Sequence, residues 1–141
     1  VLQILDNQYF REIKNYIKKN FENKEDIVIF SKLDNRYLKK LYKEANFYIF
    51  SSYCEVFGLT SLEAMSQNCP VLLSNKSAIP EINGKAALYF DPDDENEIKN
   101  SMIKIMNDNE LRKVLIERGL ERISIFNWQV TVKKTIEVLE I

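Results

Sequence analysis

The sequence of 141 residues contains no histidine and only two cysteines, Cys54 and Cys69. Without histidine it offers neither a catalytic triad built on a His base nor a His-ligated metal centre. Two cysteines are too few for a disulfide framework or a four-ligand zinc site. Because free cysteine is among the residues most often buried, we expect both to be small hydrophobic core residues.

An excess of charge and a long apolar run are also missing. The charges of the 20 basic and 21 acidic residues nearly cancel. The chain therefore lacks the strong positive electrostatic field that is typical of nucleic-acid-binding proteins. The apolar runs are far shorter than the ~20 residues of a membrane-spanning helix, and no charged-then-apolar leader is seen. Hydrophobic residues nevertheless make up 45% of the chain, enough for a core. We therefore expect a single cytosolic domain over residues 1–141.

What the sequence does contain is an alternation of short apolar runs with helical patterns. The runs are rich in β-branched and aromatic residues and predict strands at 1–5, 26–30, 47–52, 70–74 and 87–90. After the last run only helical patterns follow. Asn127 is expected to cap the final helix, with an inward face of Trp128, Val132, Ile136 and Leu139. This order predicts a Rossmann-like α/β fold, a doubly wound parallel sheet with a helix-rich C-terminal segment.

Residues 55–63, EVFGLTSLE, hold two glutamates on either side of a glycine. They directly follow a predicted strand and so lie at the carboxyl edge of the sheet, where open parallel sheets bind ligands. The helix that begins there has unpaired N–H groups for an anion, and Gly58 allows close backbone approach. Thr60 and Ser61 add hydroxyl donors. The carboxylate of Glu63 can accept hydrogen bonds from a sugar diol.

The same segment fits a purely structural interpretation. Thr60-x-x-Glu63 and Ser52-x-x-Glu55 both match the capping box, in which the glutamate returns a hydrogen bond to the helix start. On spacing alone, capping is favoured for Glu63. The two roles are compatible, because one carboxylate oxygen can cap the helix while the other binds a ligand.

The flanking motifs are more specific than this segment alone. FSS, EVFGL, LEAM, NCPVLLS and AIPEI occur in this order. The set resembles the donor-binding domain of retaining glycosyltransferases with two Rossmann-like domains, the GT-B fold of the group 1 family. The resemblance covers nearly the whole chain and implies a C-terminal domain. Because residues 1–5 are similar to the second strand of that domain, we expect a fragment that lacks the first strand–helix unit and the acceptor-binding domain.

The resemblance also implies roles for individual residues. Glu55 would be the catalytic residue that contacts the donor sugar, and Glu63 would bind the nucleotide ribose. Glu81 matches a family glutamate, although a structural brace explains it equally well. The remaining donor-binding positions are the turn of Phe57, Gly58, Leu59 and Thr60, and the loop of Lys32 and Leu33 that frames the nucleobase.

Two substitutions depart from the family pattern. Val56 replaces a glycine next to Glu55, and Ser77 with Ala78 replaces paired glycines. Both changes add side chains near the expected donor pocket, which bears on the choice of sugar.

As a glycosyltransferase, the intact enzyme would move a hexose from a UDP-, GDP- or ADP-sugar to an acceptor hydroxyl with retention of configuration. No metal, other cofactor or nucleic acid is expected. The acceptor would be a glycan or lipid of cell-envelope polysaccharide synthesis, held by the missing domain at a membrane surface. The fragment alone is expected to be inactive.

Two other classes stay open from the sequence. One is a sugar-nucleotide epimerase of the same fold, with its acid–base residues in the missing half. The other is a receiver-like regulatory domain, with hydroxyls at Ser51 and Ser52 and a lysine at Lys76. A receiver needs clustered acidic residues for Mg²⁺ at the early strand ends, where Asp6 stands alone.

Overall fold

The structure, a computed structural model, describes residues 7–21, 27–30 and 33–139. The chain divides into two compact units, residues 1–38 and 39–141. Each unit is described by itself.

The first unit contains helix α1, Asn7–Asn20. Its apolar residues Phe10, Ile13 and Ile17 recur at helical spacing and are half-buried. The strand predicted at 26–30 is wrong for residues 27–30, which are irregular. A strand is held by hydrogen bonds to a partner strand, and composition alone does not supply that partner.

Helix α2, Asn35–Glu44, begins in the first unit and continues into the second. Asp34 accepts a hydrogen bond from the backbone N–H of Arg36 at 2.7 Å and so caps the helix. In the second unit, α2 buries Tyr42.

The second unit is built on a parallel sheet of strands β1 (Tyr48–Phe50), β2 (Val71–Ser74) and β3 (Ala87–Phe90), in that order. The register pairs Ile49 with Leu72 and Leu72 with Leu88. Pro70 lies just before β2, where its missing N–H interrupts no ladder. The predicted strands 47–52 and 70–74 are confirmed with shorter bounds, and the strand 87–90 is confirmed with the predicted bounds.

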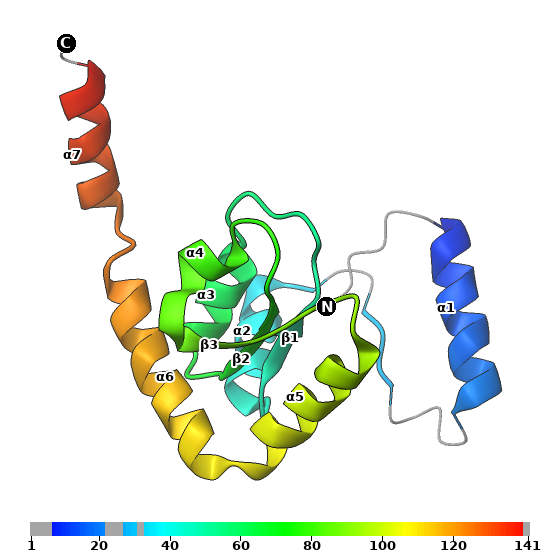
Figure 1. The fold of residues 1–141 in the computed structure, drawn as a ribbon. Coiled ribbons are helices and arrows are strands. Elements are labelled where there is room, and N and C mark those ends of the chain that lie inside the picture. Colours follow the sequence, from blue (N-terminus) through cyan, green and yellow to red (C-terminus); the bar gives the residue numbers. More distant parts are fainter. Residues whose placement is uncertain (1–6, 22–26, 31–32, 140–141) are drawn as a thin grey trace. The chain divides into compact units, whose positions relative to one another are not determined.

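Every residue of the central strand β2 is buried. Because successive side chains of a strand point to opposite faces, both faces of the sheet are covered at β2, as a Rossmann-like α/β sheet requires. One face packs its apolar side chains against α5 and α6 (Figure 1). The core cluster there consists of Leu72, Phe90, Ile105 and Leu115, with Phe47, Leu88, Ile98, Met102 and Leu111 packed around it.

Short helices connect the strands and longer helices follow them. Helix α3 (Leu59–Met65) lies between β1 and β2, and α4 (Ile79–Asn83) with the 3₁₀ turn η2 (Gly84–Ala86) lies between β2 and β3. Helices α5 (Glu95–Asn107) and α6 (Asn109–Ser124) are capped by the carboxylates of Asp94 and Asp108. The predicted helix-rich C-terminal segment is confirmed.

The last helix, α7 (Trp128–Leu139), corrects one prediction. Asn127 caps it by accepting from the N–H of Val130 at 2.8 Å, as expected. However, its predicted inward face is exposed, with Trp128 82% exposed and Ile136 46%. The reason is geometric: α7 extends away from the helices that cover the sheet (Figure 1), and none of its residues is buried.

The cysteines behave differently from each other. Cys69, just before β2, is buried, and burial raises the pKa of its thiol to about 11. Cys54 is exposed, so its predicted burial is wrong, because it lies in the turn after β1 rather than in the sheet. Among the helices that the structure describes, none is long and apolar enough to cross a membrane.

Candidate functional site

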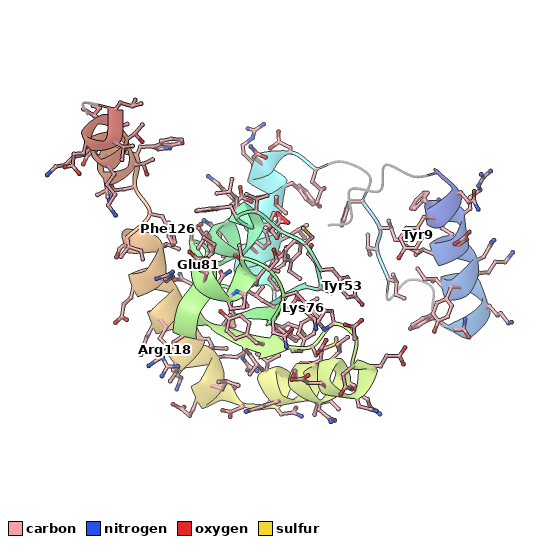
Figure 2. The ribbon with its side chains drawn as sticks, turned by 45° about the horizontal axis from the view of Figure 1, so that its top comes forward. Tyr9, Tyr53, Lys76, Glu81, Arg118 and Phe126 are labelled. Atoms are coloured by element: carbon pink, nitrogen blue, oxygen red, sulfur yellow. The ribbon has the colours of Figure 1, made fainter. Side chains whose placement is uncertain are left out.

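The candidate site lies where the three parallel strands end. Residues 51–58 follow β1, residues 75–78 follow β2, and residues 91–94 follow β3. Tyr53 and Lys76, from the first two of these loops, lie at this edge of the sheet (Figure 2). The placement at the carboxyl edge that the sequence predicted is therefore confirmed for residues 55–58.

Gly58 makes the turn between β1 and α3 sterically allowed. It immediately precedes α3 with φ +76° and ψ +50°, the left-handed region that only glycine adopts without strain. A Cβ at this position would also lie 3.4 Å from Cγ of Glu55. The glycine thus sets the reversal of the chain and leaves room for the Glu55 side chain above it.

Both capping-box interpretations are wrong. Because α3 begins at Leu59, Thr60 is already inside the helix, and its Oγ1 accepts a hydrogen bond from the Tyr48 hydroxyl at 3.1 Å. The Ser52 hydroxyl donates to the carbonyl of Cys54 at 3.0 Å, where no helix starts. Neither glutamate therefore closes a cap.

Ser61 does not offer the ligand a free hydroxyl, contrary to the sequence-based expectation. It is buried, and its Oγ lies 2.7 Å from Oδ1 of Asn83 and 2.8 Å from the carbonyl oxygen of Gly58. Asn83 in turn donates from Nδ2 to the carbonyl of Ile79 at 2.9 Å. This buried network joins the start of α3 to α4 and stabilises the turn from beneath.

Two carboxylates flank the turn, and both affect the pKa of the same tyrosine, Tyr48. Burial raises the pKa of Tyr48, the hydrogen bond to Thr60 opposes that shift, and the carboxylates of Glu63 and Glu55 add to the rise. Glu63 is exposed and Glu55 is half-buried. Within the described part of the chain, the Glu63 carboxylate has no hydrogen-bond or salt-bridge partner, so it is available to a ligand.

The backbone of Glu55 is held by Ser77, from the loop after β2. The Ser77 hydroxyl donates to the carbonyl of Glu55 at 2.9 Å and accepts from its N–H at 3.3 Å. Ser77 has φ +56°, a conformation that favours glycine, the residue that the resemblance led us to expect at this position. The substitution therefore adds a contact to the loop that carries Glu55.

A charged cluster ties the same three loops together. Lys76 Nζ lies 3.0 Å from a carboxylate oxygen of Asp91 and 3.6 Å from Asp93. The Tyr53 hydroxyl donates to Asp93 at 2.8 Å. The Asp91 partner raises the pKa of Lys76, whereas the backbone N–H of Asp93 and then the Lys76 ammonium lower the pKa of Asp91. In the structure Lys76 thus bridges two loops, which replaces its interpretation as part of a receiver-like site.

The remaining turn residues have unequal environments. Phe57 packs edge-on against Phe126, with ring centroids 5.6 Å apart, and Leu59 is 62% exposed. Val56 is 91% exposed and does not have a positive φ, so its side chain neither crowds the turn nor strains it. Glu81 lies in the first turn of α4 with an exposed side chain, and its carbonyl accepts from Arg122.

The nucleobase loop is not placed beside this turn. Lys32 lies outside the described residues. Leu33 is half-buried in the first unit, whose position relative to the second is not determined. The role of both residues stays a prediction.

Two surface hollows are lined by other parts of the second unit. One, of about 330 Å³, lies between η2 and α6 and includes Arg118 and Arg122. The other, of about 480 Å³, lies beside β3 and α5. Across the described residues, no three His, Cys, Asp or Glu side chains are grouped as metal ligands would be.

The sequence alone did not identify Tyr48 and Asn83 as supporting residues, nor the contact that Ser77 makes with Glu55. Each lies far along the chain from the residue it contacts, so spacing gave no indication of them. The departure from glycine at Ser77 was the one available signal.

Fold and site together define an α/β protein whose turn before α3 lies at the carboxyl edge of a parallel sheet, where proteins of this class bind ligands. Comparison with known families narrows this class. The model for "Glycosyl transferases group 1" matches residues 2–122, so the chain belongs to that family.

Individual relatives agree with the family. The chain is 35% identical over 104 residues to O-antigen chain mannosyltransferase B of Escherichia coli, covering 74% of this chain and 27% of that protein. It is 26% identical over 137 residues to an uncharacterized glycosyltransferase of Methanocaldococcus jannaschii, covering 96% of this chain and 38% of the relative. The chain thus spans between a quarter and two fifths of the length of these relatives.

Solved structures show the same fold. Sucrose-phosphate synthase from Thermosynechococcus elongatus superposes with a TM-score of 0.80 at 26% identity, covering 96% of this chain and 36% of that one. The C-terminal domain of a group 1 family protein (LpcC) from Francisella tularensis gives 0.70 at 24% identity, covering 84% and 62%. The chain therefore has the fold of the C-terminal domain of GT-B glycosyltransferases, as the sequence motifs implied.

Proposed function

We propose that this chain forms the donor-binding part of an enzyme that transfers a hexose from a nucleoside diphosphate sugar to an acceptor hydroxyl, with retention of configuration. The observation that carries the proposal is the pair Glu55 and Glu63, which flank a left-handed Gly58 at the carboxyl edge of β1 in a group 1 chain. Family membership favours glycosyl transfer over the epimerase and receiver-like alternatives.

In this proposal the two carboxylates recognise different parts of the donor. Glu55 accepts hydrogen bonds from hydroxyls of the sugar and orients it, and Glu63 accepts hydrogen bonds from the ribose hydroxyls. Both carboxylates flank the same turn, and the absence of a hydrogen-bond or ion-pair partner for the Glu63 carboxylate among the described residues leaves its oxygens available. Lys32 and Leu33 would frame the base.

The chemistry depends on stabilising the leaving diphosphate rather than on a strong nucleophile. The backbone amides of residues 57–60 would contact the sugar and diphosphate. Lys76 is engaged by Asp91 and Asp93, which leaves it poorly suited to balance a phosphate. We therefore expect the basic phosphate ligand in another part of the enzyme and no requirement for a metal.

The relatives suggest which acceptor to test. Two are named O-antigen chain mannosyltransferases, from Escherichia coli and Salmonella typhimurium. We propose a glycan or lipid acceptor of cell-envelope polysaccharide synthesis, held by a further domain at the cytoplasmic membrane surface. A mannosyl donor is the first candidate.

The experiment uses the full-length protein with GDP-mannose, UDP-glucose and ADP-glucose, tested first by calorimetry and then by turnover. Glu55→Ala is expected to lower kcat/KM by about 10²-fold or more, because orientation of the donor is lost. Glu117→Ala, which removes an exposed carboxylate from α6, is the matched control. Unchanged turnover in Glu55→Ala would refute the assignment, and an isomerised donor without transfer would indicate an epimerase.

A further inference from the structure

The strained residue Ser77 has a function beyond shaping its own loop. We propose that Ser77 is a positioning residue for Glu55: its hydroxyl fixes the backbone of Glu55 and thereby the direction of the carboxylate. This inference rests on the proposed role of Glu55 at the donor sugar.

The first observation is the conformation. Ser77 has φ +56°, a region that serine occupies only when its surroundings demand it. Among the described residues that are not glycine, Asn68 is the only other one with a positive φ. Asparagine tolerates the left-handed region better than serine does. A strained residue beside a proposed ligand site is the kind of outlier that indicates function.

The second observation is where the hydroxyl points. One oxygen atom serves both polar groups of the Glu55 backbone, donating to the carbonyl at 2.9 Å and accepting from the N–H at 3.3 Å. The two positions are 22 residues apart in the sequence, and the chain between them includes α3 and β2. The contact is therefore a tertiary tie between two loops, and not a local turn.

The third observation is that Ser77 is itself firmly placed. The adjacent Lys76 is bridged to Asp91 after β3, and its N–H donates to the hydroxyl of Ser74 at 3.2 Å. The N–H of Ile79 donates to the Lys76 carbonyl at 3.4 Å. Ser77 is thus held in place by contacts to β2 and to the loop after β3. Its hydrogen bonds to Glu55 in turn fix the turn of residues 51–58, which contains no helix or strand.

Nothing comparable holds Glu55 from within its own turn. In the structure as described, Ser77 supplies the hydrogen bonds to the Glu55 main chain, and the Glu55 side chain rests over Gly58. Without the hydroxyl the carboxylate would sample more positions. A misplacement of about 1 Å at a reacting centre costs about 10²-fold in rate.

Two substitutions separate the hydroxyl from the backbone strain. Ser77→Gly removes the hydroxyl and relieves the strain, whereas Ser77→Ala removes the hydroxyl and keeps it. In the full-length protein, with the donor that it turns over, both variants are expected to lower kcat about 10- to 100-fold. Affinity for the free nucleoside diphosphate should be unchanged, because Glu63 is untouched. Ser77→Gly should be no less stable than the wild type.

A double-mutant cycle links the effect to Glu55. In the Glu55→Ala background, Ser77→Gly is expected to cause no further loss of turnover. Ser124→Ala is the control, since it removes an exposed hydroxyl that bonds a local carbonyl in α6. Wild-type turnover in Ser77→Gly, or losses that multiply with Glu55→Ala, would overturn the inference.

A measurement without any donor keeps this test separate from the proposed function. Hydrogen exchange at the Glu55 amide should be faster in both Ser77 variants than in the wild type and in Ser124→Ala. Unchanged exchange would overturn the inference even if the enzyme is a transferase. Faster exchange in a protein that binds none of the three donors would support the tie while refuting the proposed function.

Discussion

Replacing Glu63 with alanine tests whether this carboxylate serves the fold or the ligand. Loss of a helix cap costs about 1 kcal/mol of stability. Thr60, however, is inside α3 rather than at its N-cap, and Glu63 is exposed. Alanine is also a slightly better helix former than glutamate. The expected change in the free energy of unfolding is therefore within about 0.5 kcal/mol of zero.

The effect on nucleotide binding should be much larger. A hydrogen bond to a charged group contributes about 1.5–3 kcal/mol. Loss of the ribose contact is therefore expected to raise the Kd for the nucleoside diphosphate about 10- to 150-fold, at about 1.4 kcal/mol per factor of ten. Calorimetric titration of the full-length protein gives the affinity, and urea unfolding gives the stability. Glu63→Gln, which keeps the shape and removes the charge, should fall between the wild type and Glu63→Ala.

The opposite pattern would refute this reasoning. A Glu63→Ala protein that binds the nucleotide normally but loses about 1 kcal/mol of stability would show that the glutamate is structural after all. Glu117→Ala provides the baseline, because Glu117 is another exposed glutamate within a helix. It should change neither quantity.

Two further predictions concern packing and pH. Gly119→Ala should gain about 1 kcal/mol of helix propensity, but its Cβ would lie 3.1 Å from Cγ and 3.3 Å from Cβ of Met65. The free energy of unfolding, measured by thermal unfolding, is therefore expected to fall by about 1 kcal/mol, and by less in a Met65→Ala background. A Gly119→Ala protein that is more stable than the wild type would contradict this contact. Lys76→Gln should lower Tm at neutral pH. The pKa of Asp91 lies below its ordinary value of 3.8, and the pKa of Lys76 lies above its ordinary value of 10.5. The stabilisation from this ion pair is therefore fully present between pH 3.8 and pH 10.5. It is lost as the pH falls through the lowered pKa of Asp91 or rises through the raised pKa of Lys76. The Tm difference should close once the pH is low enough to protonate Asp91, and an equal difference there would refute the bridge.

Periodicity and local chemistry predicted the centre of the fold well. β2 could be read as a buried strand because every residue from Val71 to Leu73 is apolar and Pro70 marks its start. Asp34 and Asn127 were recognisable as caps, because capping depends on residues only two or three positions apart. Information of this kind is local, so a single sequence contains it.

The failures at α7, at residues 27–30 and at Cys54 concern surroundings that the local sequence does not specify. The pattern of α7 shows that the helix has an apolar face, with Trp128 and Ile136 on it, but a pattern cannot say what covers that face. Residues 27–30 have strand-like composition, yet composition does not supply a hydrogen-bonding neighbour. Cys54 illustrates the same limit, because burial is a tendency of the residue type and exposure follows from its place in a turn.

The candidate site shows why the two departures from the family pattern are not equivalent. Glycine is favoured where φ is positive, and of these positions the structure places positive φ at Gly58 and Ser77 but not at Val56. Val56 can therefore replace a glycine without strain, and its exposed side chain contacts little. Ser77 does carry strain, and the two hydrogen bonds that its hydroxyl makes to Glu55 offset it. Of the two substitutions, the one at Ser77 thus bears on the geometry of the donor turn, since it couples the position of Glu55 to the loop after β2.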